Sequence, residues 1–281
     1  MAMPYTPHGS DADSAVSALL SKAFAALKNR RLLPVESLAH YVIDDYGRGE
    51  GWVVQEETTW VPYDTPHLFV LMPEGFEDEA ASIHAKIQAQ LEEICQEAGY
   101  SLRIHVMTAD SLLQDPPLAF ALASSRHLEW SFGGFDPLSQ FKGVGAETLA
   151  EHAVSAMLSL ERPLQELDRM ISQERWGIHQ GIVRLAFIRA VEVISGLGDV
   201  SLMKLGRYRS HLADRKNNLL DLAEHEQIHP QFAGLYAAAI GLRLQQSHPR
   251  IPVWNDLRTL ISEIMGWARY LAETQFAAPR V

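Results

Sequence analysis

One pentapeptide of the chain has the residue types and spacing of a zinc protease motif. His225, Glu226 and His229 spell His-Glu-x-x-His. On a helix, two histidines four residues apart lie on one face, so both can bind zinc while the glutamate acts as general base. Pro230 follows at once and disfavours helical backbone at His229, and Glu224 places a charge where a buried active-site helix would be apolar. We therefore expect a solvated helix end with no bound metal, and a zinc hydrolase on these residues is the third alternative.

A group of basic and aromatic side chains comes shortly before this motif. Residues 201–225 have the apolar spacing of a helix, and one face of that helix would carry several cations. Such a face attracts phosphate, but its arginines can equally pair with Asp214 or Asp221 of the same helix. We expect the internal pairs, and retain the group as a candidate ligand-binding surface. Its members are Lys204, Arg207, Tyr208, His211 and Arg215.

A third polar group lies in a glycine-rich segment of the N-terminal half. Residues 44–51 read Asp-Asp-Tyr-Gly-Arg-Gly-Glu-Gly, and glycines at alternate positions predict a turn. Arg48 could meet a phosphate, but the acidic surroundings favour internal pairing, which would tie the turn to the strand beside it. The candidate ligand-binding residues here are Gly47, Arg48, Gly49 and Glu50, with Asp64 further along the chain.

The elements that must position these residues differ between the two halves of the chain. Short β-prone runs in the first half alternate with amphipathic helices, whereas long helical patterns fill the second half. Strands grouped early and helices grouped late predict an α+β fold, with domains at 1–140 and 141–281. The expected strands are 38–43, 52–61, 68–72, 101–107 and 127–132. The expected helices are 13–29, 77–98, 147–172, 176–196, 201–225, 231–247 and 254–276.

The order of strand, glycine turn, strand, helix and strand in residues 38–107 resembles the nucleotidyltransferase domain of the DNA polymerase β superfamily. It is most similar to a bacterial group whose turn reads Gly-Ser-Tyr-Gly-Arg-Gly-Glu-Gly. Residues 46–51 match the last six positions of that turn, and residues 62–70 fall where the family has a strand with Asp-x-Asp. The resemblance implies a small mixed sheet in this domain. The helical half is compatible with the family's usual helical partner domain, here an all-α bundle.

The positions that match the family's metal ligands carry other side chains. The family's Gly-Ser is Asp44-Asp45 here, and two negative charges would oppose a triphosphate. Nucleotidyl transfer needs carboxylates that hold a divalent metal against the phosphates. The resemblance therefore implies a pseudoenzyme with no catalytic residues. The vestigial positions are Thr65 and His67 in place of Asp-x-Asp, and His105, with Arg103 beside it, in place of the third carboxylate.

Two other arrangements of this region remain open. An active magnesium-dependent nucleotidyltransferase could use displaced ligands at Asp44, Asp45 and Asp64. Alternatively, Asp64 with His67 and His105 could form a transition-metal site. The leading hypothesis is an inactive nucleotidyltransferase-like module that binds a protein partner or a small nucleotide-like ligand without any cofactor.

The composition limits which binding partners and which cellular compartment we expect for this chain. The net charge is −11; residues 1–140 hold 8 lysines and arginines against 20 aspartates and glutamates, whereas residues 141–281 hold 16 against 15. The acidic first half would repel nucleic acid. Cys95 is the single cysteine, so no internal disulfide forms, and the chain has no apolar run long enough for a membrane helix. We expect a cytoplasmic protein with no membrane contact, whose oligomeric state the sequence leaves open.

Overall fold

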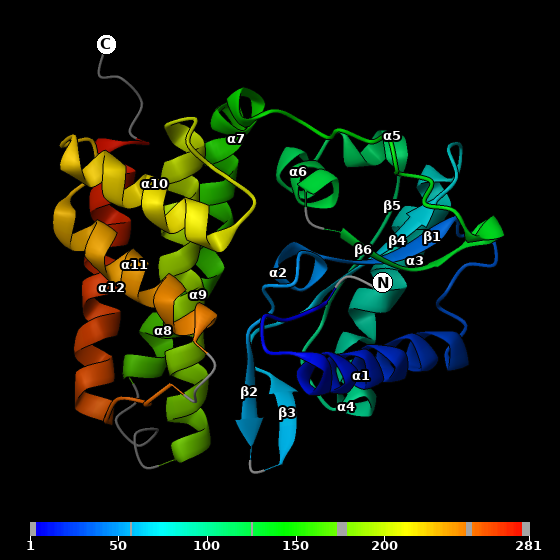
Figure 1. Cartoon of the computed structure of the whole chain (residues 1–281), viewed down its shortest axis with the longest axis horizontal. Helices are drawn as coiled ribbons and strands as arrows, with labels where there is room; N and C mark the ends of the chain where they lie inside the picture. The colour runs from blue at the N-terminus through cyan, green and yellow to red at the C-terminus, as the bar shows by residue number, and fades with distance from the viewer. Residues whose placement is uncertain (1–3, 57, 125, 173–178, 246–248, 277–281) are drawn as a thin grey trace. The chain divides into compact units, whose positions relative to one another are not determined.

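The computed structural model describes residues 4–56, 58–124, 126–172, 179–245 and 249–276. The chain divides into two compact units, Met1–Val144 and Gly145–Val281. Below they are called the N-terminal unit and the helical unit (Figure 1). The N-terminal unit contains the strands and the helical unit contains helices, which confirms the α+β class expected from the sequence.

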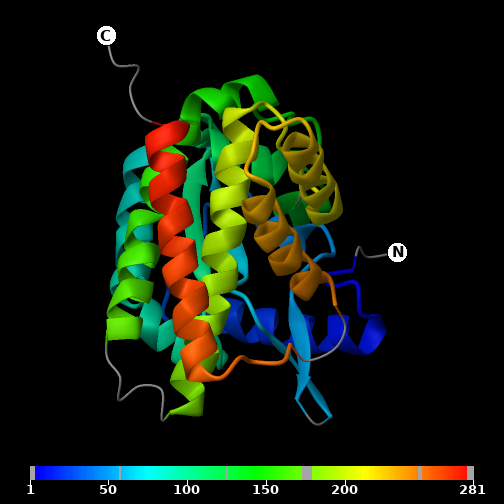
Figure 2. The same ribbon diagram turned by 90° about the vertical axis from the view of Figure 1, so that its left-hand side faces the viewer.

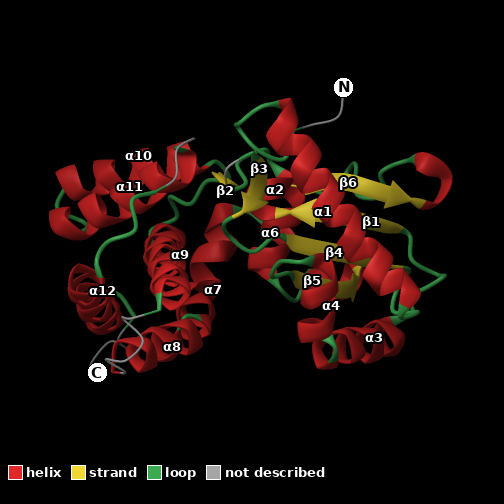
Figure 3. Ribbon diagram, turned by 90° about the horizontal axis from the view of Figure 1, so that it is seen from below, coloured by secondary structure: helices red, strands yellow, loops and turns green. Residues whose placement is uncertain are grey.

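A four-stranded mixed sheet forms the centre of the N-terminal unit. Its strands are β1 (Ala39–Ile43), β4 (His67–Met72), β5 (Arg103–Thr108) and β6 (Arg126–Ser131), in the order β5-β4-β1-β6 (Figure 3). β1 runs antiparallel to β4 and β6, and β4 runs parallel to β5. A separate antiparallel hairpin consists of β2 (Val53–Glu56) and β3 (Thr59–Pro62).

Helices cover both faces of the sheet because its two central strands are apolar on both sides. On one face Val42 and Val70 belong to the core that includes residues of α1 (Ser10–Asn29), α3 (Glu77–Ala89) and α4 (Leu91–Ala98). On the other face Tyr41 and Phe69 belong to the core shared with α5 (Ala109–Leu112) and α6 (Pro116–Ser124). This continuous burial is typical of strands in the middle of a covered sheet. β5, at the edge, alternates buried and less buried side chains instead.

The helical unit is built around α9 (Gln180–Lys204), which packs against every other helix described in this unit (Figure 2). α9 carries small and apolar residues on several sides, as a buried helix must. Gly198 allows α11 to approach closely, because a Cβ atom there would lie 2.1 Å from the Tyr236 ring. The other helices are α7 (Ala146–Ser159), α8 (Glu161–Ser172), α10 (Leu212–Glu224), α11 (Pro230–Leu244) and α12 (Trp254–Thr274).

Several predicted elements differ from the structure. The strand expected over 52–61 is instead two strands, β2 and β3, that pair as a hairpin. The helix expected over 77–98 is two helices that meet at Gln90, and the helix expected over 147–172 is two helices that meet at Leu160. The helix expected over 201–225 was wrong: α9 ends at Lys204 and α10 starts at Leu212. The helix expected over 176–196 begins at Gln180 as α9, and residues 173–178 lie outside the described residues.

None of the helices among the described residues combines the length and the apolar character that crossing a membrane requires.

Candidate functional site

The glycine-rich segment opens with a short helical turn, α2 (Asp44–Gly47), which directly follows β1. Asp44 has a left-handed backbone with φ 61°, a conformation that glycine adopts freely and aspartate tolerates better than most residues. Gly51 is required for another reason, because a Cβ atom there would lie 2.3 Å from the Tyr46 ring. The Tyr46 hydroxyl in turn donates a hydrogen bond to the Trp52 carbonyl at 2.8 Å.

Arg48 lies inside this segment and forms ion pairs with two neighbouring carboxylates. Its side chain is only 5% exposed; Nε donates to Glu50 Oε2 at 2.7 Å, and Nη2 donates to Asp45 Oδ1. The backbone N–H of Glu50 also donates to the Asp45 carbonyl at 2.7 Å. The guanidinium therefore holds the turn together. Gly49, with φ 82°, lets the chain reverse between the two carboxylates.

Asp44 and His67 form a pair at the end of two adjacent strands. The register of β1 and β4 pairs Ile43 with His67, and this places the next residue, Asp44, beside the imidazole. His67 Nδ1 lies 2.5 Å from Asp44 Oδ2, and the Asp44 side chain is 38% exposed. Burial acts to raise the pKa of Asp44, but the charge and hydrogen bond of His67 outweigh it and hold that pKa below its usual value. The carboxylate is thus ionised and already has a partner.

Two further histidines, His105 and His84, lie beyond this pair. The His105 ring lies 5.7 Å from the His67 ring, and the His84 ring stacks 6.5 Å from that of His105. Burial, with a smaller contribution from His67, lowers the pKa of His105 to about 3, and burial also lowers the pKa of His84. His105 is therefore neutral at physiological pH.

The remaining candidate positions lie around the start of β4 and β5. Asp64 and Thr65 precede β4, and Arg103 is an exposed residue opposite His67 in the β4–β5 register. Within the described ranges, no group of three or more histidines, cysteines, aspartates or glutamates is placed to hold a metal ion. The site of Asp64, His67 and His105 considered from sequence is therefore not assembled.

In the helical unit, Arg215 belongs to a buried polar network. It is 3% exposed, and its Nη1 lies 2.5 Å from Asp199 Oδ2 on α9. The Tyr236 hydroxyl of α11 donates to the other Asp199 oxygen at 2.8 Å. The guanidinium also lies over the Tyr208 ring at 5.3 Å from its centroid. Arg215 thus joins α10 to α9 and, through Asp199, to α11.

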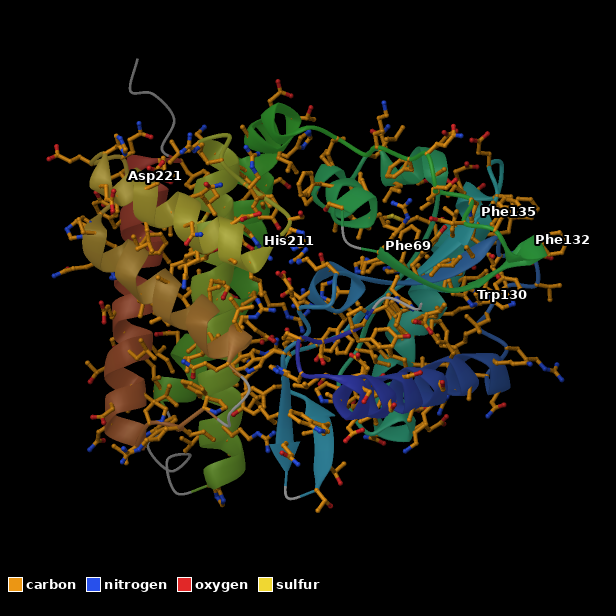
Figure 4. All side chains as sticks on the ribbon, viewed as in Figure 1. Phe69, Trp130, Phe132, Phe135, His211 and Asp221 are labelled. Carbon is orange, nitrogen blue, oxygen red and sulfur yellow. The ribbon has the colours of Figure 1, made fainter. Side chains whose placement is uncertain are left out.

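The other members of the basic group do not share a helix face with Arg215. Gly206 has φ 65°, and the N–H of Arg207 donates to the Leu202 carbonyl at 2.8 Å, an arrangement that ends a helix. This glycine is the sequence signal that could have corrected the prediction of one helix over 201–225. Arg207 and Tyr208 follow the end of α9, and His211 precedes α10 (Figure 4).

Arg207 and Lys204 lie closer to solvent. Arg207 Nη2 donates to Asp221 Oδ2 at 2.5 Å, and the two side chains are 46% and 45% exposed. This is one of the internal pairs considered from sequence. Lys204 Nζ lies 5.9 Å from the centroid of the Phe276 ring.

The His-Glu-x-x-His pentapeptide spans the turn between α10 and α11. His225 directly follows α10, Glu226 has a left-handed backbone with φ 56°, and Pro230 is the first residue of α11. His229 caps α11, its Nδ1 accepting from the Gln231 N–H at 3.3 Å. The two histidines therefore lie at the ends of different helices and do not share a helix face, so the motif lacks the geometry of a zinc protease.

Sequence reasoning did not single out an exposed aromatic group at the end of β6. Trp130, Phe132 and Phe135 are all exposed, and Phe132 and Phe135 point away from the sheet (Figure 4). Gly133 and Gly134 between them have positive φ angles, so the chain turns sharply here. The strand alternation around this segment identifies β6 but does not indicate which aromatic side chains remain uncovered.

Comparison with known proteins finds only distant structural similarity. The sequence matches no family model, and no curated protein matches it. Among solved structures, the chain is similar to a nucleotidyltransferase-like protein from Exiguobacterium sibiricum 255-15, with 14% sequence identity and a TM-score of 0.28. The alignment covers 93% of this chain and 81% of that chain.

Proposed function

We propose that the chain is a non-catalytic relative of the nucleotidyltransferases that acts as a binding module for a protein partner or a nucleotide-like ligand. The observation that carries the proposal is the Asp44–His67 pair. It lies where β1 ends and β4 begins, and the resembled family opens its glycine turn and holds its catalytic metal in this region. The left-handed backbone of Asp44 at the family's glycine position supports the same comparison.

The chemistry of this region disfavours metal-dependent transfer. Magnesium prefers several oxygen ligands together with phosphate oxygens, whereas the matched positions offer Thr65, His67 and His105. His67 and His105 are imidazoles, so neither adds a carboxylate, and His67 already contacts Asp44. Arg48, the cation within the glycine turn, is buried and paired with Asp45 and Glu50.

The two enzyme alternatives gain no support from these contacts. Displaced magnesium ligands at Asp44 and Asp45 would have to give up their pairs with His67 and Arg48. Asp64 alone would supply one carboxylate. The zinc hydrolase would need both histidines of the pentapeptide on one helix, and they are separated by a turn.

The proposal predicts the outcome of a nucleotide-transfer assay. The full chain is incubated with each radiolabelled nucleoside triphosphate, with magnesium or manganese, and with protein, RNA and small-molecule acceptors. We expect no incorporation of label above that seen with heat-denatured protein. Incorporation that disappears in Asp64→Ala would overturn the proposal and establish the alternative with displaced ligands.

A binding experiment then distinguishes the two kinds of ligand. Calorimetric titration with nucleoside mono- and triphosphates is carried out with a chelator and, separately, with magnesium. A nucleotide-binding module of this kind binds without the metal, and Asp44→Asn strengthens binding because it removes a negative charge. Binding that strictly requires magnesium would contradict the proposal. Absence of nucleotide binding in both conditions would leave a protein partner as the ligand.

A further inference from the structure

A surface groove in the helical unit lies between the start of α11 and the middle of α12. It has a volume of about 400 Å³ and is shallow and broadly open to solvent. Aromatic residues dominate its walls, although it lies on the surface of the unit. Its lining residues are His229, Gln231, Glu263, Gly266, Trp267 and Tyr270.

Three aromatic rings in this groove stand at steep angles to one another. The Trp267 and Tyr270 rings are perpendicular, at 89°, with centroids 5.6 Å apart. The His229 ring lies 4.9 Å from the Trp267 ring and meets the Tyr270 ring edge-on at 6.3 Å. Trp267 also contacts the buried Phe232 ring, with centroids 5.7 Å apart. Edge-to-face contacts of this kind stabilise the cluster and fix the orientation of its rings.

The charge of the groove is negative. Glu263 is its single carboxylate, and no lysine or arginine is among its lining residues. The Trp267 indole N–H points to Glu263 Oε1 at 3.4 Å, so the carboxylate lies at the edge of the ring. The Gln231 N–H donates to His229 Nδ1 at 3.3 Å, which orients the imidazole at the start of α11.

Gly266 is one of the residues that line the groove. It lies in the interior of α12, where glycine costs a helix about 1 kcal/mol relative to alanine. A Cβ atom at this position would meet no atom within 4 Å, so helix packing does not demand a glycine here. The missing side chain leaves open space beside Trp267 and Tyr270.

We propose that this groove binds a small quaternary ammonium compound, of the choline type, without an anionic group. The faces of tryptophan and tyrosine attract cations within about 6 Å of the ring centroid, and aromatic groups of this kind recognise quaternary ammonium ligands. A trimethylammonium head is apolar on its surface and positively charged overall, which matches aromatic walls beside one carboxylate. A metal ion or a primary amine would instead seek several oxygen ligands, and the groove has one carboxylate for them.

Binding to the full chain tests this proposal directly. The probes are choline chloride and tetramethylammonium chloride, titrated at constant ionic strength and followed by calorimetry and by the indole N–H signals in NMR spectra. The matched control ligand is 3,3-dimethyl-1-butanol, which has the shape of choline without its charge. We expect saturable binding of both cations in the millimolar range or tighter, and little binding of the alcohol.

Variants separate the contributions of the ring and the charge. Trp267→Leu should weaken choline binding about fivefold or more. Glu263→Gln, at an exposed position, should weaken it by about twofold to fivefold. Trp130→Leu removes another exposed tryptophan, in the N-terminal unit, and should leave the affinity unchanged. Circular dichroism checks that each variant is folded.

Three results would overturn the proposal. The first is an absence of saturable binding by both cations. The second is equal binding of choline and its neutral isostere, which would indicate a merely apolar groove. The third is binding that survives both Trp267→Leu and Glu263→Gln. If a trimethyllysine peptide bound and free choline did not, the proposed small-molecule ligand would be wrong and the groove would bind a modified protein.

Discussion

Arg48 in the N-terminal unit and Arg215 in the helical unit are both buried arginines paired with carboxylates, but they find their partners in different ways. Arg48 pairs with Asp45 and Glu50, which lie three residues before it and two residues after it. Arg215 pairs with Asp199, which lies on a different helix and also accepts from Tyr236 of a third. The first network stabilises one turn, whereas the second joins three helices. The same arginine–carboxylate pairing thus acts locally in one unit and between helices in the other.

The largest effect should follow from removing Arg215. Arg215→Met keeps much of the side-chain volume but leaves the Asp199 carboxylate without its cation between packed helices. Breaking such a buried pair costs about 3–5 kcal/mol in the free energy of unfolding. The control is Arg207→Met, whose exposed pair with Asp221 is worth about 0.2–1 kcal/mol. Hydrogen exchange of α9 and α10 peptides, with urea denaturation, measures both; equal losses would show that Arg215 has no special role.

Arg48→Met should have a smaller effect. Asp45 and Glu50 lie in a turn that can relax toward water. We therefore expect the free energy of unfolding to fall by about 1–3 kcal/mol, the cost of leaving a charged hydrogen-bonding group without its partner. Adding Asp45→Asn to Arg48→Met should restore part of this loss because it removes the repulsion between the two carboxylates. Hydrogen exchange of peptides covering β1 and α2 measures the change. A loss of stability larger than that of Arg215→Met would contradict the expected order of the two effects.

The stability of the N-terminal unit should fall in acid, because this unit buries histidines. Burial lowers the pKa of His105 to about 3 and that of His40 to about 4. The unfolded chain takes up these protons near pH 6.5 and the folded unit does not, so stability falls as the pH drops from about 6.5 toward 4. The slope reaches at most about 1.4 kcal/mol per pH unit for each histidine. Hydrogen exchange at several pH values, corrected for intrinsic rates, should show a shallower slope for this unit in His105→Phe; an unchanged slope would exclude this cause.

The smallest expected effect concerns the backbone of Asp44. Asp44→Gly and Asp44→Ala both remove the pair with His67, so the difference between them isolates the left-handed conformation. Alanine should be less stable than glycine by about 1–2 kcal/mol, because its Cβ atom crowds the following carbonyl at positive φ. Urea denaturation of the two variants side by side measures this difference. Equal stabilities would mean that residue 44 is not held at positive φ.

Much of the fold was predictable from local patterns. The apolar run of β4 and the alternation of β5 identified both strands, and the α+β class followed from the grouping of strands and helices. Breaks within helical stretches were harder to detect, because side-chain periodicity continues across Gln90 and Leu160 while the backbone does not. The end of α9 did have a signal, Gly206, which the helical pattern around it outweighed.

The contacts of the candidate sites were less predictable. The internal pairing of Arg48 was predicted because its carboxylates are close in sequence. The Asp44–His67 pair depends on the register between two antiparallel strands, which residue spacing does not specify. The groove beside Trp267 depends on how the end of one helix meets the side of another. Such contacts follow from tertiary packing, which sequence patterns describe only in outline.

The central position of α9 has a consequence for synthesis on the ribosome. Chains emerge from the N-terminus, and domains tend to fold as units in that order. The N-terminal unit has all the strands of its sheet once β6 and the segment as far as Leu138 have been made. The helical unit has to wait, because α9 packs against α12, the last helix described. A nascent chain that stalls before α12 would leave part of the apolar surface of α9 uncovered, and chaperones recognise surfaces of that kind.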